Sequence, residues 1–110
     1  MKNRVYLILL ALTDSDLHGL GIARAVHELS DGRTRLWPAS LYGTLDELTE
    51  SGLIEELDDP RQRPADESEK KRFYRLTRLG HRALAEETDQ LAALVKIAKS
   101  RLKSRAGAAS

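Results

Sequence analysis

The chain contains no cysteine, and this absence excludes several classes of protein at once. Without thiols there is no disulfide framework, no cysteine nucleophile, no thiolate zinc site and no iron–sulfur cluster. Long apolar runs are also missing, because the longest, Val5–Leu12, has eight residues and is too short to span a bilayer. No small-residue cleavage site follows it, so we expect neither a signal peptide nor a membrane partner. The default expectation is a cytoplasmic protein.

The chain has 110 residues, which is the length of one domain. Its net charge is close to zero, at +1. The charges are nevertheless unevenly placed, because residues 1–60 carry −6 and residues 61–110 carry +7. The basic excess lies in Arg61–Arg82 and Lys96–Arg105. This asymmetry favours an anionic partner on one side of the molecule. A pair of solvated faces is the plainer alternative.

Three helices are predicted in the first half of the chain. Asn3–Leu12 is almost uniformly apolar and consists mainly of helix formers. A second helix opens at Gly19, with one apolar face made by Ile22, Val26 and Leu29. Trp37-Pro38 then keeps the chain extended, and Ser40 is the expected N-cap of a third helix. Gly52 is its expected C-cap, and its apolar stripe is Leu41, Leu45 and Leu48.

A hairpin follows the third helix. The segments Leu53–Leu57 and Arg72–Leu76 both alternate in hydropathy, which is typical of short strands. Between them, Asp58–Lys71 contains two prolines and nine charged residues. We expect a two-stranded wing with a long mobile tip.

The last helix is predicted to start after a Thr77 cap and to run from Arg78 to about Ser104. It carries a seam at the alternating spacing of a coiled coil: Leu84, Thr88, Leu91, Val95, Ala98 and Leu102. A domain of this size cannot cover so long a rod, so we expect these residues to form a homodimer interface. The predicted organisation is a winged helix-turn-helix domain over residues 1–77, a dimerisation helix over 78–105 and a disordered tail over 106–110.

Three helices, a two-stranded β wing and a long C-terminal helix define a mainly α fold of the winged helix-turn-helix type. Two stretches are similar to the PadR family of winged-helix transcriptional regulators: Ser40-Leu41-Tyr42 with Gly52-Leu53-Ile54, and Lys71–Thr77 followed by Gly80. The pair His18-Gly19 followed by Ile22 resembles the family's second-helix opening. The resemblance implies a homodimer that binds double-stranded operator DNA, usually as a repressor, through an inverted repeat. Its C-terminal helices would form the dimer contact.

The candidate DNA contacts fall into two sets. The third helix carries Asp46, Glu47 and Glu50, which are unfavourable near phosphates, so base contacts are expected only at its N-terminal end: Ser40, Tyr42, Gly43 and Thr44. The acidic end is expected to tilt away from the duplex or to pair with arginines such as Arg33 or Arg35. Expected contacts from the wing and to the backbone are Arg33, Arg35, Arg61, Arg63, Lys70, Lys71 and Arg72.

Other kinds of site find little support. Asp14-Ser15-Asp16 begins like a calcium loop, but Ala25 stands where the bidentate glutamate belongs. The histidines show no ligand spacing, and there is no Gly-rich phosphate loop or nucleophile arrangement, so we expect neither a metal, nor a cofactor, nor an enzyme. Trp37 is either a structural anchor or a contact for a small-molecule effector. The alternative function is a winged-helix dimer that serves as a protein-interaction or small-molecule-binding module.

Overall fold

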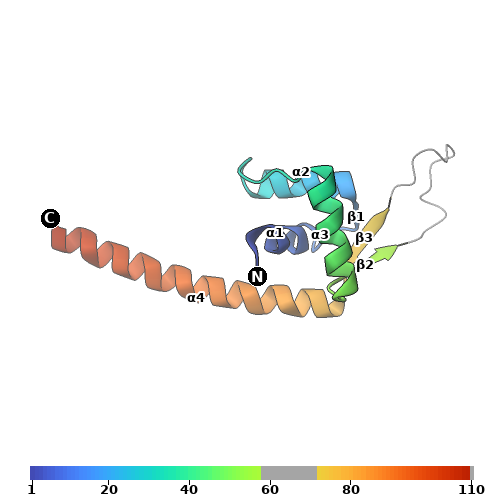
Figure 1. Cartoon of the computed structure of the whole chain (residues 1–110). Coiled ribbons are helices and arrows are strands. Elements are labelled where there is room, and N and C mark those ends of the chain that lie inside the picture. Colours follow the sequence, from blue (N-terminus) through green and yellow to red (C-terminus); the bar gives the residue numbers. More distant parts are fainter. Residues whose placement is uncertain (58–71, 110) are drawn as a thin grey trace.

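The computed structural model describes residues 1–57 and 72–109, with side chains as far as residue 105. The elements in order are α1 (Asn3–Ala11), β1 (Leu17–His18), α2 (Gly19–Leu29), α3 (Pro38–Glu50), β2 (Ile54–Leu57), β3 (Phe73–Leu76) and α4 (Arg78–Ala109). Figure 1 shows α1 and α2 side by side, α3 crossing them next to the small sheet at one edge, and α4 extending away from the domain. The expected mainly helical winged fold is confirmed.

The apolar run near the N-terminus is continuous because α1 lies at the centre of the domain. Leu7, Ile8, Leu9, Ala11 and Leu12 are all buried, so nearly every side of this helix meets another element. The predicted faces of α2 and α3 contribute Ile22, Val26, Leu41, Leu45 and Leu48 to the same core. Each large side chain buried here stabilises the fold by about 1.5–3 kcal/mol, and this burial fixes the angle between α2 and α3.

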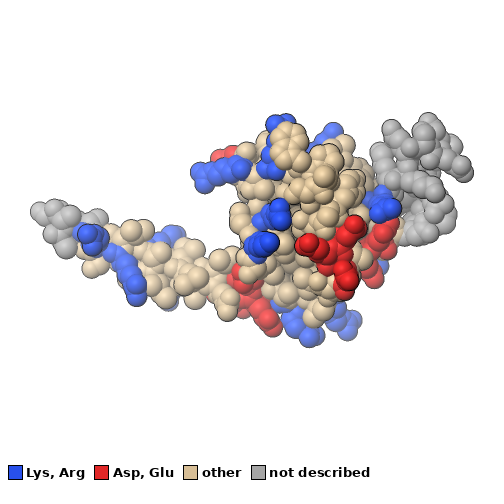
Figure 2. All heavy atoms as spheres, viewed as in Figure 1, with Lys and Arg blue, Asp and Glu red and all other residues tan. Residues whose placement is uncertain are grey.

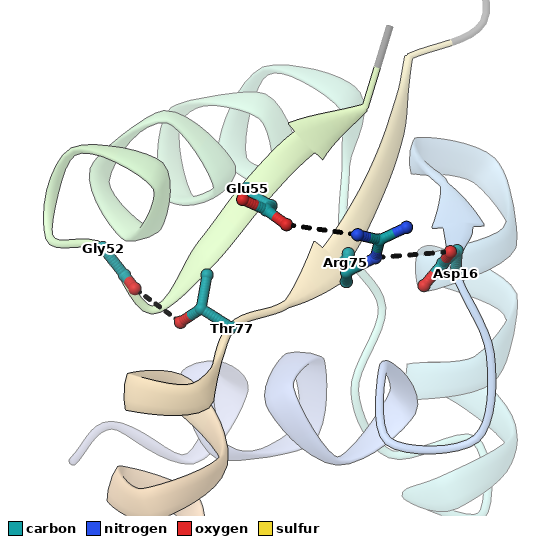
Figure 3. A network of polar contacts seen from close by, with 5 residues as sticks. All are labelled: Asp16, Gly52, Glu55, Arg75 and Thr77. Carbon is teal, nitrogen blue, oxygen red and sulfur yellow. Dashed lines mark hydrogen bonds and ion pairs between the residues drawn. The ribbon is translucent and has the colours of Figure 1, made fainter. Parts of the chain in front are cut away.

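The wing sheet has a strand that the sequence did not predict. Its order is β1-β3-β2, with both pairs antiparallel, so the two-stranded wing becomes a three-stranded sheet. In β1, Leu17 pairs with Tyr74 and His18 pairs with Phe73. Arg75 of β3 pairs with a carboxylate on each side, at 3.7 Å from Asp16, which precedes β1, and at 3.4 Å from Glu55 of β2 (Figure 3).

The two ends of α3 are set by different residues. The N-cap is Trp37, whose extended backbone precedes Pro38 at the first helical position, so the prediction that Ser40 caps the helix is wrong. Proline fits at that position because it has no N–H to leave unpaired. At the other end, Gly52 adopts φ 80°, and the Leu53 amide donates to the Leu48 carbonyl at 3.0 Å. The expected glycine cap is therefore confirmed as a Schellman motif.

The terminal helix starts as predicted and ends later. The Gly80 amide donates to the Thr77 hydroxyl at 3.0 Å, which is the expected cap. The helix has 32 residues, about 48 Å at 1.5 Å per residue, and reaches Ala109. The tail that we expected to be disordered is thus helical as far as Ala109. The apolar spacing ends at Leu102, so it did not predict where the helix ends. The alanines among Ala106–Ser110 favour helix and extend it beyond that point.

Candidate nucleic-acid interface

The exposed face of α3 lies opposite its buried stripe. Leu41, Leu45 and Leu48 face the core, so the helical spacing turns the remaining positions outward. The exposed residues are Pro38, Ala39, Ser40, Tyr42, Gly43, Asp46, Glu47, Thr49 and Glu50. Because α2 packs behind α3, this face is the only part of the helix that a duplex could reach, as in a helix-turn-helix.

The four residues that we predicted for base contact are not equivalent. Ser40 is exposed, and its hydroxyl accepts a hydrogen bond from Arg4 at 3.2 Å. Gly43 is exposed, and a Cβ atom added there would meet nothing within 4 Å. Thr44 is only 4% exposed, and its hydroxyl donates to the Ser40 carbonyl at 2.9 Å. Thr44 therefore cannot offer its side chain to a base edge in this conformation.

Tyr42 is held against the start of α2 with part of its ring exposed. A Cβ atom at Gly19 would lie 2.5 Å from the hydroxyl oxygen and 2.9 Å from Cζ of Tyr42, so the hydroxyl end of the ring packs directly on the backbone there. This contact explains why a residue without a side chain precedes Leu20 in the sequence. The ring is thereby fixed between the N-terminal part of α3 and the start of α2.

The C-terminal half of α3 is acidic. Asp46, Glu47 and Glu50 are exposed, and Glu55 and Glu56 of β2 follow. Figure 2 shows acidic side chains gathered over this part of α3 and the neighbouring strands. Basic side chains lie around the end of the domain where α3 begins. The acidic side chains of α3 therefore lie at its C-terminal end, whereas neighbouring elements contribute basic side chains near its start.

Arg72 at the start of the returning wing strand forms an ion pair with this acidic group. Its Nε atom lies 3.5 Å from the Glu56 carboxylate, which raises the pKa of the guanidinium above its ordinary value, and the Asp46 charge adds to the effect. Burial raises the pKa of the neighbouring Tyr74 phenol, with contributions from Glu56 and Asp46. Asp46 thus acts electrostatically on Arg72, whereas the sequence suggested Arg33 or Arg35 as its partner.

The remaining predicted basic contacts divide by position. Arg33 and Arg35 lie exposed in the turn between α2 and α3. The wing residues Arg61, Arg63, Lys70 and Lys71 lie outside the described part of the chain. Their role in DNA binding stays a prediction from the sequence.

A groove of about 430 Å³ runs between α2 and the start of α3. Trp37 is one of its walls and is 64% exposed, so it is not a core anchor. The guanidinium carbon of Arg35 lies 5.1 Å from the Trp37 ring centroid, within cation–π range. The other lining residues are Leu20, Ala23, Arg24, His27, Glu28, Leu36, Pro38, Leu41 and Tyr42.

Sequence reasoning missed two arginines at this end of the domain. Arg4 reaches from α1 to the Ser40 hydroxyl, and Arg24 lines the groove from α2. Neither belongs to a basic run in the sequence, because each is the only arginine or lysine of its helix. Only the packing of α1 and α2 against α3 brings them to the same place.

The predicted dimer seam on α4 divides at residue 88. Leu84 is only 6% exposed and belongs to the core of its own domain, and the Thr88 hydroxyl lies 2.8 Å from the Tyr6 hydroxyl of α1. Leu84 and Thr88 therefore already have partners within the chain. Beyond them the seam is open, with Leu91 39% and Leu102 69% exposed. The open part consists of Leu91, Val95, Ala98 and Leu102, flanked by Leu94 and Ile97.

The described part of the chain contains neither a metal-ligand cluster nor a membrane-spanning helix. Among residues 1–57 and 72–109, no three His, Asp or Glu side chains come together as a metal site would require. Within the same residues, no helix combines the length and the hydropathy needed to cross a membrane.

Comparison with known proteins identifies the family. Residues 8–86 match the transcriptional regulator PadR-like family. A 37.1 kDa protein in transposon TN4556 of Streptomyces fradiae is 36% identical over 88 residues, which make up 80% of this chain and 23% of that protein. The chain thus spans less than a quarter of the length of this relative.

Solved structures share the fold at low sequence identity. A PadR family transcription regulator from Clostridium difficile has a TM-score of 0.74 and 22% identity, covering 92% of this chain and 99% of that one. Bacillus subtilis PadR, solved in complex with operator DNA, has a TM-score of 0.64 and 23% identity, covering 79% of this chain and 47% of that one. F93 from STIV, a winged-helix DNA-binding protein, has a TM-score of 0.68 and 20% identity, covering 86% and 94%. The chain belongs to the PadR-like family of transcriptional regulators, which is not a family of enzymes.

Proposed function

We propose that this regulator binds double-stranded operator DNA sequence-specifically and acts as a repressor. The observation that supports this most directly is the polarity of α3. Its N-terminal end exposes Ser40, Tyr42 and Gly43 beside Arg4 and other arginines, whereas its far end is acidic. The phosphates on both sides of a major groove favour entry of the N-terminal end of α3, which has arginines around it. This end of the helix would therefore read the base edges.

The division of labour follows from the same geometry. Ser40 and Tyr42 offer hydroxyl groups at the exposed start of α3, where they would contribute to base choice. Arg33, Arg35 and the wing cations would contact phosphates, which supply affinity whatever the sequence. Thr44 is left out of this set because it is buried.

The active form in this proposal is a homodimer with two-fold symmetry. The open seam of α4 exposes Leu91, Val95 and Leu102 on one side of a helix about 48 Å long. Such an apolar side is stable in water when a second copy covers it. Two identical reading heads would then recognise an inverted repeat.

Selection from a pool of random duplexes tests the proposal. The purified chain is incubated with the pool, bound duplexes are amplified, and the enriched sequences are footprinted. An inverted repeat protected over both halves is expected. A single asymmetric half-site at saturation would contradict the two-fold arrangement, and no enrichment at all would contradict specific DNA binding.

A second candidate function is a small-molecule-binding or protein-interaction module on the same fold. The groove beside Trp37 and the acidic half of α3 are the observations that favour it. The two candidates differ in salt dependence, because phosphate binding releases counterions and weakens steeply as salt rises. If the chain does not bind a random duplex even at about 50 mM salt, the second function is favoured.

A further inference from the structure

We infer that Trp37 is a positioning residue for Arg35, and that the α2–α3 turn thereby contacts a phosphate of the DNA backbone. This inference rests on the DNA-binding function proposed above. The indole of Trp37 is exposed: the residue is 64% exposed, although tryptophan has the largest apolar side chain in the protein. Leaving such a surface in water forgoes stabilisation that burial would bring.

The fold itself does not use the Trp37 ring. The residue caps α3 through its extended backbone, and its side chain makes no capping hydrogen bond. It is not part of the buried core. The guanidinium carbon of Arg35 lies over this ring, 5.1 Å from its centroid. The ring therefore acts on Arg35 more directly than on the core.

Stacking prepares an arginine for an anion. A guanidinium group presents its flat face to an aromatic ring and keeps its N–H groups in the plane, where they remain free to donate. Holding the side chain over Trp37 also lowers the rotamer entropy that Arg35 would lose on binding. The pair thus offers a pre-oriented fork of donors, which matches two oxygens of one phosphate.

The surroundings of the pair favour an anion as the occupant. Arg24 lines the same groove from α2, and Arg4 reaches the first turn of α3 through Ser40. That first turn contains no acidic residue and carries the positive end of the helix dipole. Glu28 is the single acidic side chain among the groove-lining residues. Cations from α1, α2 and the turn therefore converge beside the α3 end that would enter DNA.

Binding of the full chain to a short random-sequence duplex tests the role of Arg35. Fluorescence anisotropy is measured from about 50 to 200 mM salt for the wild type and for Arg35→Ala. We expect Arg35→Ala to weaken binding about tenfold and to reduce the log–log salt slope by about one for each protomer bound. Arg82→Ala is the matched control, because it removes the same exposed charge from α4. It should leave the slope nearly unchanged.

Variants of Trp37 test positioning. Trp37→Leu keeps an apolar side chain but removes the aromatic face, and we expect it to weaken binding about two- to fivefold. Trp37→Phe keeps a face and should bind nearly as the wild type does. When Arg35 is already alanine, Trp37→Leu should have no further effect, since the two residues act through one contact. A merely structural role for Trp37 would instead lower the thermal midpoint equally in both backgrounds.

The possible outcomes separate this inference from the proposed function. If the wild type binds no duplex at any salt concentration, DNA binding itself is wrong. If the wild type binds but Arg35→Ala keeps its affinity and slope, the turn does not contact a phosphate. If Trp37→Leu and Arg35→Ala weaken binding additively, Trp37 acts independently of Arg35, as a groove contact would. Either of the last two results overturns the inference while leaving the proposed function intact.

Discussion

The hydroxyl of Thr77 donates a 2.6 Å hydrogen bond to the carbonyl oxygen of Gly52 (Figure 3). The Thr77 hydroxyl oxygen also accepts a hydrogen bond from the Gly80 amide at 3.0 Å, so one side chain caps α4 and holds the glycine that follows the C-cap of α3. Backbone contact supports this junction, because the Thr77 amide donates to the Leu53 carbonyl at 3.1 Å. The helix proposed to read DNA and the helix proposed to pair with a second copy are thus joined at one residue.

Replacing Thr77 tests how much this junction contributes. Thr77→Val keeps the shape but removes both side-chain hydrogen bonds, leaving the Gly52 carbonyl without its 2.6 Å donor. Loss of a cap and of a hydrogen bond should lower the free energy of unfolding by about 1–3 kcal/mol. Thr77→Ser retains the hydroxyl and is the control. Urea denaturation that gives the same stability for Thr77→Val and the wild type would show that the junction contributes nothing.

Two helical glycines should respond in opposite ways to the same substitution. A Cβ atom at Gly80 would collide with the Leu53 carbonyl oxygen, whereas one at Gly43 meets nothing within 4 Å. Gly43→Ala should therefore stabilise the protein by about 0.5–1 kcal/mol through helix propensity. Gly80→Ala should destabilise it by about 2 kcal/mol or more, because backbone must move. Equal shifts in thermal midpoint would contradict the packing described for Gly80.

The sequence predicted most of the fold because its signals were local and strong. Leu41, Leu45 and Leu48 share a helical face, and Gly52 and Thr77 mark helix ends by backbone geometry and side-chain chemistry. The strand β1 was missed because two residues, Leu17 and His18, cannot show alternation. It exists only because β3 offers it a partner, which is a contact between segments far apart in the sequence.

The candidate site was less predictable for a related reason. Helical spacing placed Leu84 and Thr88 on one seam with Leu91, but only the position of α1 decides that the first two are already occupied. Thr44 looked accessible in the sequence, yet it lies on the edge of the buried stripe. Arg4 was overlooked because its proximity to Ser40 spans two helices. Tertiary packing, which no local pattern records, determined each of these outcomes.

The open seam predicts how two substitutions on α4 will differ. Leu91→Asp places a charge on the exposed part and should give a folded monomer, because Leu91 is outside the core of its own domain. Leu84→Ala removes a buried side chain and should lower stability by about 2–5 kcal/mol. Sedimentation equilibrium and circular dichroism separate the two effects. A wild type that sediments as a monomer at micromolar concentration would refute the dimer.

Asp46 should oppose DNA binding through its charge. It lies close enough to Arg72 to contribute to the raised pKa of that guanidinium. Asp46→Asn should strengthen binding to selected and random duplexes alike, because it removes an anion beside the proposed interface. Glu86→Gln, on α4, provides the control. A change of base preference at one position, without a general gain in affinity, would show instead that Asp46 reads a base.

Tyr42 should act on specificity instead of general affinity. Its hydroxyl and the adjoining ring carbons pack on Gly19, and Tyr42→Phe removes the hydroxyl while keeping the ring carbons in that contact. Binding to the selected duplex should weaken relative to random duplex, with the salt slope unchanged, because no phosphate contact is lost. Parallel titrations of both duplexes measure the ratio. An equal loss on both would place the Tyr42 hydroxyl on the backbone instead of a base.

The most direct test of sequence-specific DNA binding is the ratio of affinities for the selected inverted repeat and for a scrambled duplex of equal length and composition. Both are titrated with the full chain at physiological salt. The account predicts a ratio of about 10³ or more, in the range of specific regulators, with two protomers bound per repeat. A ratio close to one would show that the exposed start of α3 reads no sequence, and would contradict the account.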